Sequence, residues 1–224
     1  MSDSKPAATP PHDWPQFIRD NTTLMTTPLV PEIRLHLAVE SVPIWLKTEA
    51  ELGTMNVPPP FWAFSWAGGQ AVARYLLDHP ALVAGRRVLD LGCGSGLAAI
   101  APMLAGAAAV LAADIDEVAL IATTMNAAAN GVSVQTTSAD LLAGPPGDFD
   151  VILVGDLFYE REMAERLLKF ITTATHQGQI VFIGDPSRKH FPTGQFQHCI
   201  DYQVPVTREL EDCELKRTSV WRLG

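Results

Sequence analysis

Val88-Leu89-Asp90-Leu91-Gly92-Cys93-Gly94-Ser95-Gly96 is the most informative stretch of this chain. An apolar run ends in an acidic residue and a glycine-rich turn, and the alanine-rich segment 97–104 follows. This order predicts a buried parallel strand, a tight loop and a helix that packs back on the strand. Because Gly92 and Gly94 have no Cβ, the loop lets the backbone approach a ligand, and the free N–H groups of the following helix point at it.

The spacing of the glycines distinguishes two classes of cofactor. A dinucleotide-binding fingerprint needs glycine or alanine three residues after Gly94, where this chain has Leu97. The pattern Asp90-x-Gly92-x-Gly94-x-Gly96 instead resembles motif I of the class I, seven-strand methyltransferases, which bind S-adenosylmethionine. The resemblance implies that Asp90 orients the loop and helps recognise the methionine end of the cofactor, with Gly92 and Gly94 beside it. A glycine-rich turn without a ligand is the alternative.

Length, charge and composition limit the possible functions. With 224 residues, the chain can form one domain with an N-terminal extension. Its formal charge of −9 argues against nucleic-acid binding, which needs a basic face, and suits a basic protein partner. The three cysteines and six histidines show no ligand spacing, so we expect no metal site and no disulfide. No segment has the pattern of a membrane span or a secretory signal. We therefore expect a monomer without nucleic-acid or membrane partners.

The chain divides into a predicted disordered tail (1–13), an N-terminal extension or cap (14–60) and a methyltransferase domain (61–224). The predicted fold class is α/β: a doubly wound, Rossmann-like sheet of seven strands, mostly parallel, with an antiparallel C-terminal hairpin. The cap is expected to contain a short helix at 14–20, a half-buried strand at 31–37 and the segment 42–52. In the domain we expect helices at 71–77, 97–104, 118–129 and 161–173, and strands at 107–113, 132–136, 149–156, 179–183, 199–206 and 218–223.

Acidic residues follow the ends of several predicted strands, where open α/β sheets bind their ligands. Asp114 comes about twenty residues after the glycine loop and is placed to hold the ribose hydroxyls. Asp116 is interpreted as the N-cap of the next helix. Asp140 is predicted to accept a hydrogen bond from the adenine amino group, with an ordinary loop aspartate as the alternative. Ile115 and Leu141, beside these acids, complete the expected cofactor site.

Asp156, Phe158 and Tyr159 follow the central strand and are predicted to lie near the transferring methyl group. Trp66, Gly68 and Gly69 are predicted to form a loop over the cofactor, since an aromatic face attracts a sulfonium. A hydrophobic plug of the aromatic residues over the sheet edge is the alternative. A lysine amine, with a free pKa of roughly 10.4, must lose its proton before it can react. Desolvation by the aromatic residues would lower that pKa. Asp156, also assigned to cofactor binding, is expected to position the amine rather than act as a strong base.

Several segments together closely resemble the electron transfer flavoprotein β-subunit lysine methyltransferase family. They are Trp66-Ala67-Gly68-Gly69-Gln70-Ala71, Arg74-Tyr75-Leu76-Leu77-Asp78, Asp114-Ile115-Asp116, Gly155-Asp156-Leu157-Phe158-Tyr159 and Ile183-Gly184-Asp185-Pro186. Ala67 is a departure, because the family usually has proline there. The resemblance implies S-adenosylmethionine-dependent methylation of lysine side chains on the β subunit of electron transfer flavoprotein.

Two further expectations concern the setting and the alternatives. The first residues contain acids and lack arginine, so no mitochondrial transit pattern is seen, and we expect a bacterial-type, cytoplasmic member. Within enzymes, the alternative substrate is another basic protein, such as a ribosomal protein, or a small amine. From a different class, the chain could be a non-catalytic S-adenosylmethionine-binding module.

Overall fold

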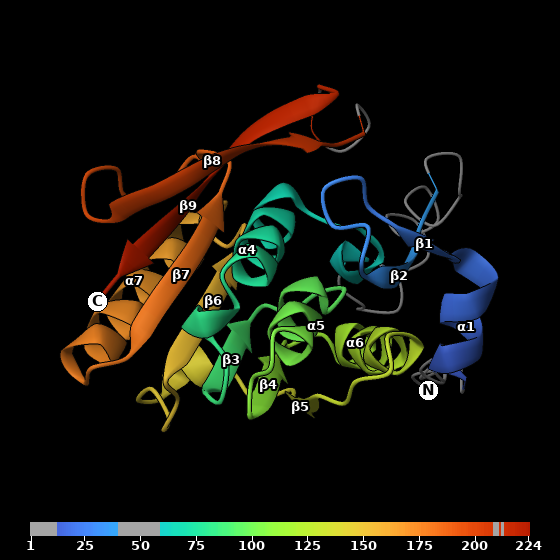
Figure 1. Cartoon of the computed structure of the whole chain (residues 1–224), viewed down its shortest axis with the longest axis horizontal. Coiled ribbons are helices and arrows are strands. Elements are labelled where there is room, and N and C mark those ends of the chain that lie inside the picture. Colours follow the sequence, from blue (N-terminus) through green and yellow to red (C-terminus); the bar gives the residue numbers. More distant parts are fainter. Residues whose placement is uncertain (1–12, 40–58, 208–210, 212) are drawn as a thin grey trace, which may run out of the picture.

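The computed structural model describes residues 13–39, 59–207, 211 and 213–224. The predicted tail and the segment 42–52 of the predicted cap therefore lie, apart from Asp13, outside the described residues. A seven-stranded sheet with the order β5-β4-β3-β6-β7-β9-β8 forms the centre of the molecule (Figure 1). Its parallel strands are β3 (Arg87–Leu91), β4 (Ala109–Ala113), β5 (Gln135–Thr137), β6 (Val151–Gly155) and β7 (Ile180–Asp185). Strand β9 (Leu215–Leu223) pairs antiparallel with β7 on one side and with β8 (Gln197–Pro205) on the other. The predicted fold class is confirmed.

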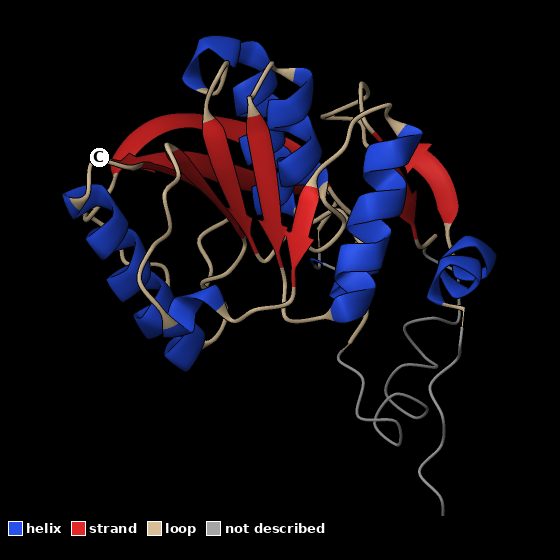
Figure 2. Cartoon of the chain, turned by 90° about the horizontal axis from the view of Figure 1, so that it is seen from below, coloured by secondary structure: helices blue, strands red, loops and turns tan. Residues whose placement is uncertain are grey.

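Helices cover both faces of the sheet, as Figure 2 shows. The helices are α4 (Ala67–Asp78), α5 (Leu97–Leu104), α6 (Glu117–Ala129) and α7 (Arg161–His176). Strand β6 is buried on both sides, and its successive side chains point to opposite faces. Val151 and Leu153 join a core cluster with residues of α4 and α5, whereas Ile152 and Val154 join one with residues of α7. The unbroken apolar run of this strand is explained by this double burial.

The N-terminal part adds a helix and a small antiparallel sheet beside α6. The elements are α1 (Trp14–Asn21), β1 (Thr23–Thr26) and β2 (Arg34–Leu37). The backbone N–H of His36 donates to Asn126 Oδ1 over 2.7 Å, which ties β2 to α6. The predicted helix and the half-buried strand are confirmed, while β1 was not predicted because all four of its residues are exposed. Among the described residues, no helix has the length and apolar character needed to cross a membrane.

Most predicted elements differ from the structure by only a few residues, but α4 begins four residues earlier than expected, at Ala67. Gly68 and Gly69 were assigned to a loop and instead form its first turn. This turn lies directly on the ends of β6 and β7. A Cβ added to Gly68 would lie 2.2 Å from the carbonyl oxygen of Gly184, and one added to Gly184 would lie 2.0 Å from the carbonyl oxygen of Gly68. Only residues without a side chain permit this backbone-to-backbone contact.

We predict that Gly68→Ala lowers the free energy of unfolding by about 2 kcal/mol or more, since the new methyl group must displace backbone atoms. Gly69→Ala is the matched control, because a Cβ there meets nothing within 4 Å. It should leave stability unchanged or raise it by up to about 1 kcal/mol, as expected for alanine in a helix. Urea unfolding of both variants measures the difference, and equal effects would contradict the contact.

Candidate active site

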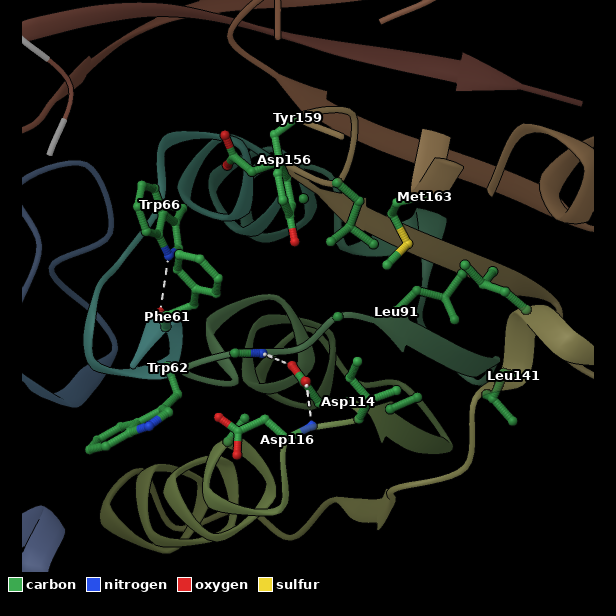
Figure 3. Close-up of a pocket in the computed structure, with 18 of the residues that line it drawn as sticks. Phe61, Trp62, Trp66, Leu91, Asp114, Asp116, Leu141, Asp156, Tyr159 and Met163 are labelled. Carbon is green, nitrogen blue, oxygen red and sulfur yellow. Dashed lines mark hydrogen bonds between the residues drawn. The ribbon is translucent and has the colours of Figure 1, made fainter. Parts of the chain in front are cut away.

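A cavity of about 490 Å³ opens at the carboxyl ends of β3, β4 and β6 (Figure 3). This is the edge of an open α/β sheet where ligands bind. In Figure 3, Asp114 and Asp116 lie across the cavity from Tyr159 and Asp156, with Trp66 and Phe61 on one side. Most of the lining is apolar, with a few carboxylates and one guanidinium. The residues that line it come from the segments 59–66, 91–94, 113–119, 139–142 and 155–163, and from Arg188.

The glycine loop after β3 forms part of the cavity wall. Gly92 and Gly94 line it, with φ angles of 64° and 51° that favour glycine. The Gly94 N–H donates to Asp114 Oδ2 over 3.0 Å, so the loop and the end of β4 hold each other in place. The two glycines and Asp114 are thus brought together, as their predicted common role requires.

Asp90 lies inside the protein rather than on the cavity wall, since only 1% of it is exposed. Its Oδ2 has no hydrogen-bond partner among the described residues. Burial, reinforced by the nearby charge of Asp114, raises the pKa of Asp90 well above its usual range. This carboxyl therefore favours its protonated form. Its cofactor-binding role remains a prediction, and it would act from behind the loop.

The three residues after β4 are fixed by backbone hydrogen bonds. Asp114 Oδ1 accepts from the Asp116 N–H over 3.0 Å, and Asp116 Oδ1 accepts from the Val118 N–H over 2.9 Å. Asp116 is therefore the N-cap of α6, as predicted, and it also lines the cavity. Burial raises the pKa of Asp114, and it raises the pKa of Asp116 to about 6. Ile115 lines the cavity between them and is 67% exposed, so it offers an apolar surface to a ligand.

The loop after β5 closes the opposite end of the cavity. Asp140 and Leu141 both line it. Asp140 Oδ1 accepts from the Leu142 N–H over 3.1 Å, and Oδ2 pairs with Arg166 over 2.5 Å. Both oxygens of Asp140 thus have protein partners, which fits the alternative of a structural loop aspartate. Its contact with adenine remains a prediction.

Asp156 accepts three hydrogen bonds from two residues, Gly68 and Arg188. It has a φ of 59°, unusual for a residue other than glycine, at the end of β6. Oδ2 accepts a short hydrogen bond from the Gly68 N–H, and Oδ1 accepts from Arg188 Nε over 2.9 Å and from Arg188 Nη2 over 2.6 Å. Burial raises the pKa of Asp156, while the Arg188 guanidinium opposes that rise. Gly68 does not line the cavity and donates its N–H to Asp156, and its role in cofactor binding remains a prediction.

Arg188 and Glu211 are functional candidates that were not predicted from the sequence. Arg188 lines the cavity and pairs with both Asp156 and Glu211. The position of Arg188 just after β7 could have predicted its place at the site, because β7 lies beside β6. Glu211 gives no such signal, since it lies in the connection between β8 and β9. In the described residues, no group of three or more His, Cys, Asp and Glu side chains is placed to hold a metal ion.

Aromatic residues form the rim of the cavity. The ring centroids of Phe61 and Trp66 are 5.9 Å apart, and those of Phe61 and Tyr159 are 6.2 Å apart. The Trp66 Nε1–H donates to the Phe61 carbonyl over 3.0 Å, which fixes the indole. Phe158, by contrast, is fully buried and packs edge-on against Phe191. The prediction that Phe158 touches the reacting groups is not supported, because its side chain points into the core on the α7 side of the sheet.

Comparison with known proteins identifies relatives over nearly the whole chain. A family model described as ribosomal protein L11 methyltransferase (PrmA) matches residues 75–178. The electron transfer flavoprotein beta subunit lysine methyltransferase of Danio rerio is 40% identical over 217 residues, covering 94% of this chain and 83% of the relative. The enzyme of the same name from Homo sapiens is 34% identical over 213 residues, covering 92% and 80%.

A solved structure supports the fold. Magnesium protoporphyrin IX methyltransferase from Synechocystis PCC 6803, with bound SAM, matches with a TM-score of 0.50 at 16% identity, covering 69% of this chain and 76% of that one. At this identity the likeness concerns the fold alone. The relatives found by sequence show the family as well as the fold, since the alignments with them cover more than nine-tenths of the chain. The chain therefore belongs to the electron transfer flavoprotein β-subunit lysine methyltransferase family, a family of S-adenosylmethionine-dependent protein-lysine methyltransferases.

Proposed function

We propose that this protein transfers methyl groups from S-adenosylmethionine to lysine side chains of the β subunit of electron transfer flavoprotein. The observation that carries the proposal is the 40% identity to the Danio rerio enzyme over 94% of the chain, which includes every segment of the cavity. A ribosomal protein is a weaker candidate substrate. The ribosomal protein L11 methyltransferase of Thermotoga neapolitana matches only 99 residues, 44% of this chain and 36% of that enzyme.

The cavity fits S-adenosylmethionine in size and chemistry. Its volume of about 490 Å³ lies within the range of roughly 300–1,000 Å³ that small-molecule sites have. Asp114 and Asp116 offer carboxylates to the ribose hydroxyls, and Ile115 and Leu141 offer apolar surface to the adenine. The glycine loop allows close approach of the methionine part, and the face of Trp66 suits a positive sulfonium. When bound, the cofactor supplies an activated methyl group on that sulfonium.

The protein must bind the substrate lysine as a neutral amine in a pocket from which water is excluded. Phe61, Trp66 and Tyr159 provide an apolar rim that can hold the lysine alkyl chain and exclude water. Tyr159 is 48% exposed at this rim, and burial of its hydroxyl raises the pKa, so it stays protonated at neutral pH. Desolvation disfavours the ammonium form of the incoming lysine, whose free pKa is roughly 10.4. The loss of its proton to water before methyl transfer leaves the nitrogen lone pair available.

We predict that unmethylated electron transfer flavoprotein, incubated with this enzyme and S-adenosylmethionine, gains mass in steps of one methyl group on its β subunit. Intact-mass spectrometry measures the steps. An Asp156→Ala variant should abolish them, because it removes the carboxylate that accepts hydrogen bonds from Gly68 and Arg188 at the end of β6. If the wild-type protein binds the cofactor and no step appears, the substrate assignment is wrong, and other basic proteins should be tested in the same way.

A second prediction concerns the cofactor site. Asp114→Ala should weaken S-adenosylmethionine binding about tenfold or more, since a hydrogen bond to a charged group contributes about 1.5–3 kcal/mol. Asp148→Ala is the control, because that side chain is 94% exposed and lies outside the cavity lining. Titration calorimetry gives both dissociation constants. Equal affinities for the two variants would show that Asp114 does not hold the cofactor.

A further inference from the structure

Arg188 lines the cavity, so its positive charge interacts with any ligand that binds there. Its side chain is 19% exposed, and it pairs with two nearly buried carboxylates, Asp156 at 9% and Glu211 at 3%. Nη1 donates to Glu211 Oε2 over 3.1 Å, and the guanidinium carbon lies 5.8 Å from the centroid of the Trp66 ring. The guanidinium is therefore clamped between the end of β6, the β8–β9 connection and the aromatic rim.

The clamp leaves Asp156 little capacity to bind a substrate amine. Oδ1 already accepts two hydrogen bonds from Arg188, and Oδ2 accepts one from Gly68. A carboxylate oxygen has two acceptor positions, so only one position on Oδ2 remains. Asp156 is therefore better described as the anchor of Arg188 than as the group that receives the lysine.

The charges around Arg188 nearly cancel. Lys216 Nζ lies 3.1 Å from Glu211 Oε2, so Arg188 and Lys216 balance Asp156 and Glu211. Asp185 Oδ1 accepts from the Arg188 backbone N–H over 2.7 Å, and burial raises the pKa of Asp185 to about 7. The other titratable groups that face the cavity are Asp114, Asp116, Asp140 and Tyr159.

We propose that Arg188 sets the electrostatic potential of the reaction pocket, cancelling the charge of Asp156 so that the substrate lysine binds as a neutral amine. An unpaired carboxylate at this place would attract the ammonium form, which has no lone pair for the methyl group. A nearby charge of this kind moves a pKa by about 1–3 units. The guanidinium keeps its charge at every working pH, so its influence is constant.

The inference rests on the proposed lysine methylation, yet it has a consequence that needs no protein substrate. S-adenosylmethionine carries a positive sulfonium, whereas its product S-adenosylhomocysteine is a neutral thioether. A change of charge in the pocket must therefore alter the ratio of the two affinities. Arg188→Gln changes the sum of the four paired side chains by one negative charge, and Glu211→Gln changes it by one positive charge. Both variants break the Arg188–Glu211 pair. Arg188→Gln also loses the pair with Asp156, and Glu211→Gln also loses the pair with Lys216, so each variant removes two ion pairs.

Titration calorimetry on the full chain gives the first test. Arg188→Gln should shift the affinity ratio toward S-adenosylmethionine by about threefold or more, and Glu211→Gln should shift it by a similar factor toward S-adenosylhomocysteine. Arg188→Lys keeps the charge and should restore the wild-type ratio. Unchanged ratios, or shifts of both glutamine variants in one direction, would overturn the proposal, even if the wild-type protein methylates its substrate.

The dependence of kcat on pH gives the second test, because it reports groups in the enzyme–substrate complex. The pH of half-maximal kcat should move upward by about one unit in Arg188→Gln, and should move downward or stay unchanged in Glu211→Gln. An Asp185→Asn background removes the titration of that carboxyl as a source of the inflection. A uniform loss of kcat at every pH would contradict the proposal. Absence of methylation by the wild-type protein would instead count against the substrate, while the affinity ratio would still test Arg188.

Discussion

Gly68 donates its backbone N–H to Asp156 because the first turn of α4 lies directly on the ends of β6 and β7. This contact requires glycine at both Gly68 and Gly184, and it accompanies the left-handed backbone of Asp156. The carboxylate is then turned toward Arg188, and Trp66, at the N-cap of α4, comes to lie over the same guanidinium. One backbone contact thus positions a carboxylate, a guanidinium and an aromatic ring at the cavity.

The carboxylates that line the pocket already have hydrogen-bond or ion-pair partners within the protein. Asp114 accepts two backbone N–H groups, Asp140 pairs with Arg166, and Asp156 pairs with Arg188. Prior hydrogen bonding preorganises these groups, so they lose little freedom when a ligand arrives. It also weakens the attraction of the pocket for an ammonium ion. This arrangement suits an enzyme that needs its lysine uncharged at the moment of transfer.

Much of the fold was predictable because local patterns agree with the global architecture. The apolar run of β6 and the cap of α6 at Asp116 are both read from short segments, and both are confirmed. The helical Gly68 was missed, because a glycine pair is typical of a loop unless the opposing backbone is known. Phe158 was assigned to the site by adjacency, but neighbouring residues after a strand can face opposite directions. Glu211 could not be found, since only the three-dimensional fold brings it to Arg188.

The decisive measurement is a crystal structure of this protein with S-adenosylhomocysteine and a lysine peptide from the β subunit of electron transfer flavoprotein. We expect the ribose at Asp114 and Asp116, the lysine alkyl chain between Phe61 and Tyr159, and Arg188 still bound to Asp156. A lysine amine paired with Asp156 in place of Arg188, or a cofactor bound outside this cavity, would contradict this expectation.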